Sequence, residues 1–280
     1  MKWWKWAALA GFVASFAGPA WADGHGGQPV PWQLNLQKAV TPIMERVANF
    51  HSLLLIIITL ICIFVFALIG YVLYRFREDR NPVPSRRSHH TLLEVIWTAV
   101  PVLILVIIAV PSFKLLYYMD VVPETEFRIK AIGNQWYWTY EYPDQGNFTF
   151  DALIKPDDEL ENGEPRLLAT DNQVVVPVNT KIRLQVTASD VLHSWAVPAF
   201  GIKIDAIPGR LNEAWFEAKE TGVFYGQCSE LCGRGHGFMP IAVKVVTKEE
   251  FAAWVEKARE EFAKVDDPSV TVAELDRVAQ

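Results

Sequence analysis

Cysteine and positive charge are both scarce in this sequence. Three cysteines among 280 residues are too few for a disulfide scaffold. The net charge is −6, so the chain lacks the basic surface that a nucleic-acid partner requires. No Cys-x-x-Cys-His motif is present, which argues against covalently attached haem. By contrast, 51% of the residues are hydrophobic, and these side chains must be buried in a protein core or in a membrane.

Two long runs without charged side chains contain many of these hydrophobic residues. They cover residues 47–74 and 95–113, and each is long enough to cross a hydrocarbon core of about 30 Å as a helix. We expect a transmembrane helical hairpin over residues 47–118, with spans at about 48–74 and 93–116. The connecting loop contains five arginines and two acidic residues. Basic loops stay in the cytoplasm, so both chain ends are expected outside it.

The first 22 residues have the pattern of a secretory signal peptide. Lys2 and Lys5 precede an apolar stretch over residues 7–17, and Ala20-Trp21-Ala22 fits a small-residue cleavage site. A third membrane helix is the alternative, although the apolar stretch is shorter than a span. Residues 23–46 would then form a periplasmic N-terminal segment.

After residue 118 the pattern changes to short strands. Apolar, β-branched and aromatic runs occur at residues 127–132, 136–142, 174–178, 182–186 and 241–246, separated by turn residues. Such runs favour an all-β sandwich or barrel, which we place at residues 119–248. Apolar residues at helical spacing between 248 and 264 predict a surface helix, so residues 249–280 are expected to form a C-terminal helix and tail.

The β-domain contains very few potential soft metal ligands, and most of them lie in one segment. Four fall within Cys228-Ser-Glu-Leu-Cys232-Gly-Arg-Gly-His236-Gly-Phe-Met239, and His193 is expected to reach them from another strand. Two thiolates, two imidazoles and a thioether suit copper rather than magnesium or calcium. A single copper site needs only one cysteine. Two thiolates can instead bridge two copper ions and share one unpaired electron between them.

Other chemistry remains open on the residues alone. A structural Cys₂His₂ zinc site is possible, although it leaves Met239 without a role. A Cys228–Cys232 disulfide is compatible with an oxidising compartment, but it leaves both histidines without a function. A Cys-x₃-Cys copper chaperone would be expected to have a βαβ framework, which the strand pattern does not indicate.

Five segments together resemble one known family. They are Glu94-Val-Ile-Trp-Thr, Gly133-Asn-Gln-Trp-Tyr-Trp-Thr-Tyr-Glu-Tyr, Val191-Leu-His-Ser-Trp-Ala-Val-Pro, Asp205-Ala-Ile-Pro-Gly-Arg-Leu-Asn and the segment from Cys228 to Pro240. They resemble cytochrome c oxidase subunit II of bacterial type, over about residues 40–260. The resemblance implies a membrane-anchored all-β protein, with a two-helix hairpin and a cupredoxin-like Greek-key β-barrel.

The resemblance also implies a ligand set for a dinuclear copper (CuA) centre. Its members are Cys228 and Cys232 as bridges, His193, His236, the Met239 sulfur and the backbone carbonyl of Glu230. The carboxylate of Glu230 would bind a magnesium or manganese ion shared with subunit I. Trp136 would be the first acceptor of electrons from cytochrome c, and Glu94 would lie at the mouth of a proton-uptake path. Taken alone, Trp136 could equally belong to a packed strand face.

The implied function is that of an electron-accepting subunit of an aerobic respiratory oxidase. Electrons from cytochrome c would pass through the copper pair to haem in subunit I, where oxygen is reduced to water with proton pumping. The chain would lie in the bacterial inner membrane with other oxidase subunits. Residues 120–250 contain 20 Asp and Glu against 12 Lys and Arg, an acidic balance that suits a basic electron carrier.

Three related functions share some of these features. A quinol oxidase subunit lacks the copper ligands that are present here. A nitrous-oxide-reductase copper domain would be joined to a large catalytic domain that this chain does not contain. A copper-delivery protein would hold copper loosely and have no oxidase partners.

Overall fold

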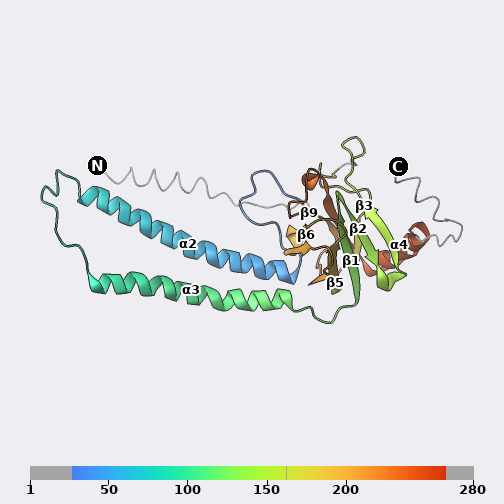
Figure 1. Ribbon diagram of the computed structural model, residues 1–280, viewed down its shortest axis with the longest axis horizontal. Helices are drawn as coiled ribbons and strands as arrows, with labels where there is room; N and C mark the ends of the chain where they lie inside the picture. Colours follow the sequence, from blue (N-terminus) through green and yellow to red (C-terminus); the bar gives the residue numbers. More distant parts are fainter. Residues whose placement is uncertain (1–26, 162, 263–280) are drawn as a thin grey trace. The chain divides into compact units, whose positions relative to one another are not determined.

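The computed structural model describes residues 27–161 and 163–262, which form two compact units (Figure 1). One unit is the helical pair at residues 42–121, and the other combines residues 27–41 with the chain after residue 121. The signal peptide expected at residues 1–22 and the tail beyond residue 262 lie outside the described residues. Each unit is described below by itself.

The first unit is a hairpin of two apolar helices, α2 (Pro42–Arg75) and α3 (Thr91–Asp120). Figure 1 shows them side by side, joined by residues 76–90. Both are long and apolar enough to cross a membrane, and their most apolar stretches have no buried residues. The guanidinium of Arg46 lies 3.8 Å from the centre of the Tyr118 ring, which links the start of α2 to the end of α3.

The second unit is a sandwich of two five-stranded sheets. The first sheet has the order β3 (Phe148–Ala152), β2 (Tyr137–Tyr142), β1 (Phe127–Asn134), β5 (Ile182–Ala188), β8 (Asn212–Phe216). The second has the order β4 (Val174–Pro177), β10 (Pro240–Val246), β9 (Gly222–Cys228), β6 (His193–Val197), β7 (Ile202–Ala206). The helical hairpin and this β-domain confirm the expected fold class, a membrane hairpin with a cupredoxin-like domain.

Strand alternation places the core between the sheets. Along β1 and β5 buried residues alternate with partly or fully exposed ones, as expected for strands with one face in the core. Two tyrosines of β2 then connect the sheets through hydrogen bonds. Trp195 Nε1 donates to the Tyr140 hydroxyl, and the Tyr142 hydroxyl donates to Val175 O while accepting from Val175 N. The strands that carry the site are thus held at a fixed separation.

The C-terminal helix α4 (Lys248–Glu261) closes one end of the sandwich. Thr247 and Glu250 form a capping box at its start. Phe251, Val255 and Ala258 are buried, and the Phe251 ring stacks on Phe127 of β1 with centroids 5.3 Å apart. The helix expected from the sequence is therefore present, beginning at Lys248.

The N-terminal segment before α2 packs on the β-domain. Gly27 O accepts a hydrogen bond from Tyr225 N of β9 at 3.0 Å. Val40 N donates to Ala199 O, and Val40 O accepts from Lys219 N at 2.8 Å. The sequence analysis treated this segment only as a separate stretch and did not predict that it covers β9.

The five predicted runs all form strands, and five further strands were not predicted. The latter are β3, β6, β7, β8 and β9. They are short, and polar residues or glycine interrupt their apolar pattern, as in His193-Ser-Trp-Ala-Val. Two of these unpredicted strands, β6 and β9, carry ligand residues.

Candidate metal centre

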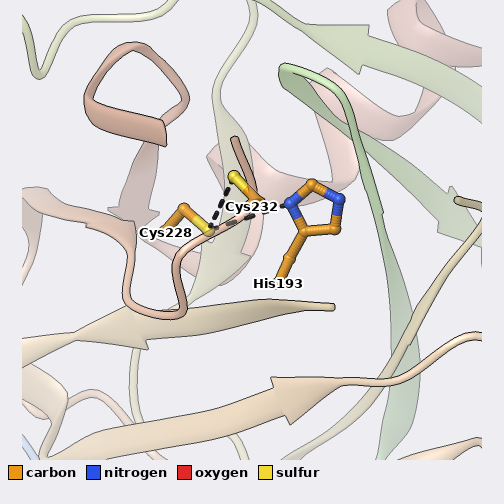
Figure 2. A group of neighbouring side chains, drawn as sticks. All are labelled: His193, Cys228 and Cys232. Atoms are coloured by element: carbon orange, nitrogen blue, oxygen red, sulfur yellow. Dashed lines mark hydrogen bonds between the residues drawn. The ribbon is translucent and has the colours of Figure 1, made fainter. Parts of the chain in front are cut away.

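Two neighbouring strand ends and the loop after them bring the predicted ligands together. His193 begins β6 and Cys228 ends β9, and these strands pair antiparallel with Trp195 opposite Cys228. Cys232 lies in the loop that follows. His236 begins the short helix η3 (His236–Phe238), directly before Met239. Figure 2 shows His193 and the two cysteines pointing toward one another.

The two sulfurs form the middle of the cluster. Cys228 Sγ lies 3.8 Å from Cys232 Sγ, and the ligand atoms of His193 and both cysteines all lie within 4.8 Å of one another. His193 Nδ1 is 3.8 Å and Glu230 O is 3.4 Å from Cys228 Sγ. His236 Nδ1 lies 3.6 Å from the second sulfur, Cys232 Sγ.

Met239 completes the set, because its Sδ lies 3.5 Å from Cys232 Sγ. The structure therefore places each of the other four predicted donors within 3.8 Å of one of the two sulfurs. Each sulfur has one imidazole nitrogen and one further donor beside it.

The geometry separates the alternatives that the sequence left open. A disulfide requires about 2.05 Å between sulfurs, and both cysteines are free thiols in the structure. A tetrahedral zinc site would use two sulfurs and two imidazoles, which leaves the Met239 sulfur and the Glu230 carbonyl unused. The whole donor set, soft sulfur with imidazole, fits copper.

The cluster is dry. His193 is fully buried, and Cys228, Cys232 and Met239 are each no more than 5% exposed. His236 is the only side-chain donor of the set that is partly exposed. A buried charge in such surroundings needs a partner, because desolvation disfavours the charged form.

Burial and proximity make the two thiols ionise at different pH values. Burial raises the pKa of Cys228, but hydrogen bonding with the His193 ring and with the backbone of Glu230 and Ser194 outweighs burial and lowers the pKa to about 6. Burial and the negative charge of Cys228 raise the pKa of Cys232. A bound cation would favour the thiolate form of both cysteines.

A carboxylate fixes the orientation of the His193 ring. Asp190 Oδ1 accepts a hydrogen bond from His193 Nε2 at 2.8 Å, which leaves Nδ1 toward Cys228. Histidines that bind metals usually donate their second ring N–H to such a group. The sequence analysis did not predict this contact, although the spacing of three residues between Asp190 and His193 could have indicated it.

Trp136 lies against the ligand loop. Its Nε1 donates to Cys232 O at 3.3 Å, and its side chain is partly exposed. Gly235 makes this contact possible, because a Cβ there would lie 2.3 Å from the indole ring. Trp138, by contrast, is completely buried in the core. Trp138 therefore belongs to the packed face, whereas Trp136 packs against the core with part of its side chain and is partly exposed.

The two acidic site candidates lie in different units. The Glu230 side chain is exposed beside the metal cluster, while its carbonyl faces Cys228 Sγ. Glu94 belongs to the first turn of α3, and its Oε1 accepts from the backbone N–H of His90 at 3.1 Å. Glu94 therefore takes part in capping a helix end, a role that the sequence analysis did not predict.

Several surface carboxylates of the β-domain already have basic partners. Glu141 lies 3.2 Å from Lys130, Asp144 lies 3.4 Å from Arg128, and Asp157 lies 2.8 Å from Arg166. Their charges are partly compensated, so the negative charge of this unit comes from its overall excess of acidic over basic residues.

Two family profiles match the sequence. One is described as cytochrome C oxidase subunit II, periplasmic domain, and matches residues 127–246; the other is described as its transmembrane domain and matches residues 29–115. The second match includes α2 and most of α3. Together with the apolar character of these helices, it shows that the chain is anchored in a membrane.

Related sequences agree with these matches. The probable cytochrome c oxidase subunit 2 of Rickettsia felis is 52% identical over 228 residues, which are 81% of this chain and 72% of the relative. Cytochrome c oxidase subunit 2 of Zea mays is 50% identical over 231 residues, 80% of this chain and 89% of the relative. The crystal structure of the periplasmic domain of cytochrome oxidase subunit II from Bradyrhizobium japonicum has 61% identity, with a TM-score of 0.48. It covers 51% of this chain and 100% of that domain.

Replacing Gly235 with alanine is expected to disturb the metal centre. The new Cβ would collide with the Trp136 ring, although the backbone at φ −90° accepts alanine. Overpacking of this kind costs about 1–3 kcal/mol, so the loop should move and copper should bind less tightly. Gly237→Ala is the matched control, because nothing lies within 4 Å of its Cβ position. If the purified Gly235→Ala and Gly237→Ala variants contain equal amounts of copper, the contact between Gly235 and Trp136 does not support the metal centre.

Proposed function

The chain belongs to the cytochrome c oxidase subunit II family, and we propose that it is the electron-accepting subunit of an aerobic respiratory oxidase. Electrons from cytochrome c pass to a dinuclear copper centre in this chain and then to haem in subunit I. Oxygen is reduced to water there, with proton pumping. This chain transfers electrons and carries no oxygen chemistry of its own.

The observation that carries the proposal is the arrangement of donors around two buried sulfurs. Two free thiols lie 3.8 Å apart, and each has an imidazole nitrogen within 4 Å. This arrangement suits two metal ions that share two thiolates better than one ion with four ligands, because Met239 and the Glu230 carbonyl then both have a role. When bound, the copper pair would take up and release one electron that both ions share.

The chain's own residues create the conditions for fast electron transfer. The buried sulfurs and the fully buried His193 keep water out, which lowers the reorganisation of solvent. Asp190 holds the His193 ring, and Met239 O accepts from Cys228 N at 3.3 Å, so strand and loop ligands are connected through the backbone. Little movement of the ligands is then needed when the charge changes.

Trp136 is the proposed first acceptor of electrons from cytochrome c. Its side chain is partly exposed, and its Nε1 hydrogen-bonds to the carbonyl of the ligand Cys232. An aromatic ring that is open to solvent on one side and bonded to the copper loop on the other is suited to this role. The net acidic surface would attract a basic carrier.

The exposed carboxylate of Glu230 is proposed to bind a magnesium or manganese ion shared with subunit I. Its backbone carbonyl would serve the copper centre at the same time. Carboxylate oxygen suits these hard cations, whereas the sulfur cluster does not. A single residue would thus connect the copper centre to the partner subunit.

The proposed location is the bacterial inner membrane, with both chain ends in the periplasm. Arg75 ends α2, and the loop between α2 and α3 contains Arg77, Arg80, Arg86 and Arg87. Such a loop stays on the cytoplasmic side, which places the β-domain outside, where cytochrome c can reach it.

Copper content tests the proposed function directly. We expect the purified full chain, loaded with copper in detergent, to bind two copper ions. Its EPR spectrum should show one electron split by two equivalent nuclei. Cys228→Ser removes one bridge, so it should lose the shared signal. One copper per chain, or zinc alone in a folded protein, would refute the dinuclear centre.

Trp136→Phe should slow electron uptake from cytochrome c and leave the copper spectrum unchanged. Phenylalanine keeps an aromatic ring but lacks the indole N–H that bonds Cys232 O. Stopped-flow oxidation of cytochrome c by the assembled oxidase measures the rate, and EPR checks the centre. Tyr137→Phe, the next residue along the chain, provides a control. Unchanged kinetics for Trp136→Phe would exclude the residue as first acceptor.

Glu94→Gln separates proton uptake from helix capping. The amide keeps an oxygen that can accept from His90 N, so α3 should begin as before, but it cannot carry a proton. We expect slower steady-state oxygen reduction by the assembled oxidase, with normal copper content and normal electron uptake. If turnover stays normal, Glu94 has only the capping role.

A further inference from the structure

One carboxylate contacts both a predicted copper ligand and the segment that carries Trp136. The side chain of Asp190 accepts three hydrogen bonds: from His193 Nε2 at 2.8 Å, from Gln135 N at 2.7 Å and from Val191 N at 2.6 Å. All three partners are donors, so both oxygens of a carboxylate are used. Asp190 lies 55 residues from Gln135 in sequence, which makes this a tertiary contact.

The Gln135–Trp136 segment is in turn bonded to the ligand loop. Gln135 Nε2 donates to Cys232 O at 2.8 Å, and Trp136 Nε1 donates to the same oxygen at 3.3 Å. The segment is therefore held by Asp190 on one side and by Cys232 on the other. A continuous set of hydrogen bonds runs from His193 through Asp190 and Gln135 to Cys232.

We infer that Asp190 is a positioning residue that sets the His193 ring and, through Gln135, the place of Trp136 on the copper loop. The inference rests on the proposed function and adds a residue to it. One side chain couples the orientation of a copper ligand to that of the first electron acceptor. Changing it should affect metal retention and electron uptake together.

Hydrogen-bond chemistry explains why a carboxylate is required at this position. Asparagine offers one acceptor oxygen and a donor NH₂ group, so it cannot accept from three N–H groups in this arrangement. With the amide oxygen in the place of Oδ1, the NH₂ group faces the Gln135 N–H; with the oxygen in the place of Oδ2, the NH₂ group faces both His193 and Val191. In either orientation His193 loses its charged acceptor. Asp190→Asn therefore keeps the size of the side chain and breaks part of the network.

The test compares Asp190→Asn with Asp171→Asn in the full chain. Asp171 is a matched control, because its Oδ1 also accepts from two backbone N–H groups, of Leu153 and Asn172, at 2.7 and 2.6 Å. The change in charge is the same, and Asp171 makes none of the contacts of the copper loop. Copper retention is measured by competition with a chelator, and the imidazole nitrogen couplings are measured by EPR.

We expect Asp190→Asn to lose copper about tenfold more readily than Asp171→Asn, with altered nitrogen couplings, as for other partners of metal-binding histidines. Gln135→Ala separates the second arm of the network. It should leave the nitrogen couplings of His193 unchanged and slow electron uptake from cytochrome c, because the Asp190–His193 contact remains while the bond to Cys232 O is lost. Equal copper retention and equal spectra for Asp190→Asn and Asp171→Asn would overturn the inference.

A copper-free measurement separates this inference from the proposed function. In the chain without metal, ¹⁵N NMR of labelled histidine reports which ring nitrogen of His193 carries hydrogen. Nε2–H should dominate in the unmodified chain and in Asp171→Asn, and less so in Asp190→Asn. The same tautomer balance in all three would refute the positioning role even if two copper ions bind. A shifted balance would support it even if the copper count failed.

Discussion

Two buried sulfur atoms 3.8 Å apart are the feature on which the rest of this structure depends. The pKa of Cys228 is lowered and the pKa of Cys232 is raised. In a buried site the negative charge of one thiolate disfavours ionisation of the second thiol. Such a pair is unfavourable unless cations bind between or beside the sulfurs. The surrounding donors, two imidazole nitrogens, a thioether and a carbonyl, are those that soft cations prefer. The position of the sulfurs therefore largely determines which metal chemistry is possible.

The β-sandwich fixes one half of this arrangement and a loop supplies the other. His193 and Cys228 lie at ends of paired strands, whereas Cys232 and His236 lie in the connection between β9 and β10. A loop alone would hold its ligands loosely. Here the hydrogen bonds of Gln135 and Trp136 to Cys232 O attach the loop to the other sheet. Gly235 permits this close approach, since any side chain would displace the indole.

The sequence predicted the clustering of the candidate ligands better than it predicted the strands that carry them. Cysteine, histidine and methionine are rare in the β-domain, so their concentration between residues 228 and 239 was visible without a structure. Strands β6 and β9 were missed, because His193, Ser194 and Gln227 break their apolar alternation. The contacts of Asp190 with Gln135 and of Gln135 with Cys232 span 55 and 97 residues. Hydrogen bonds of this kind depend on how the sheets pack, which local patterns do not encode.

Backbone hydrogen bonds connect the segments that carry the candidate ligands. Ser229 N donates to Ser194 O at 2.9 Å and Cys228 N to Met239 O at 3.3 Å, so backbone bonds join β6, β9 and the end of the loop. Because these bonds do not involve the metal, a change in its charge need not alter them. A preorganised site of this kind favours repeated one-electron transfer over catalysis that requires ligands to open or exchange.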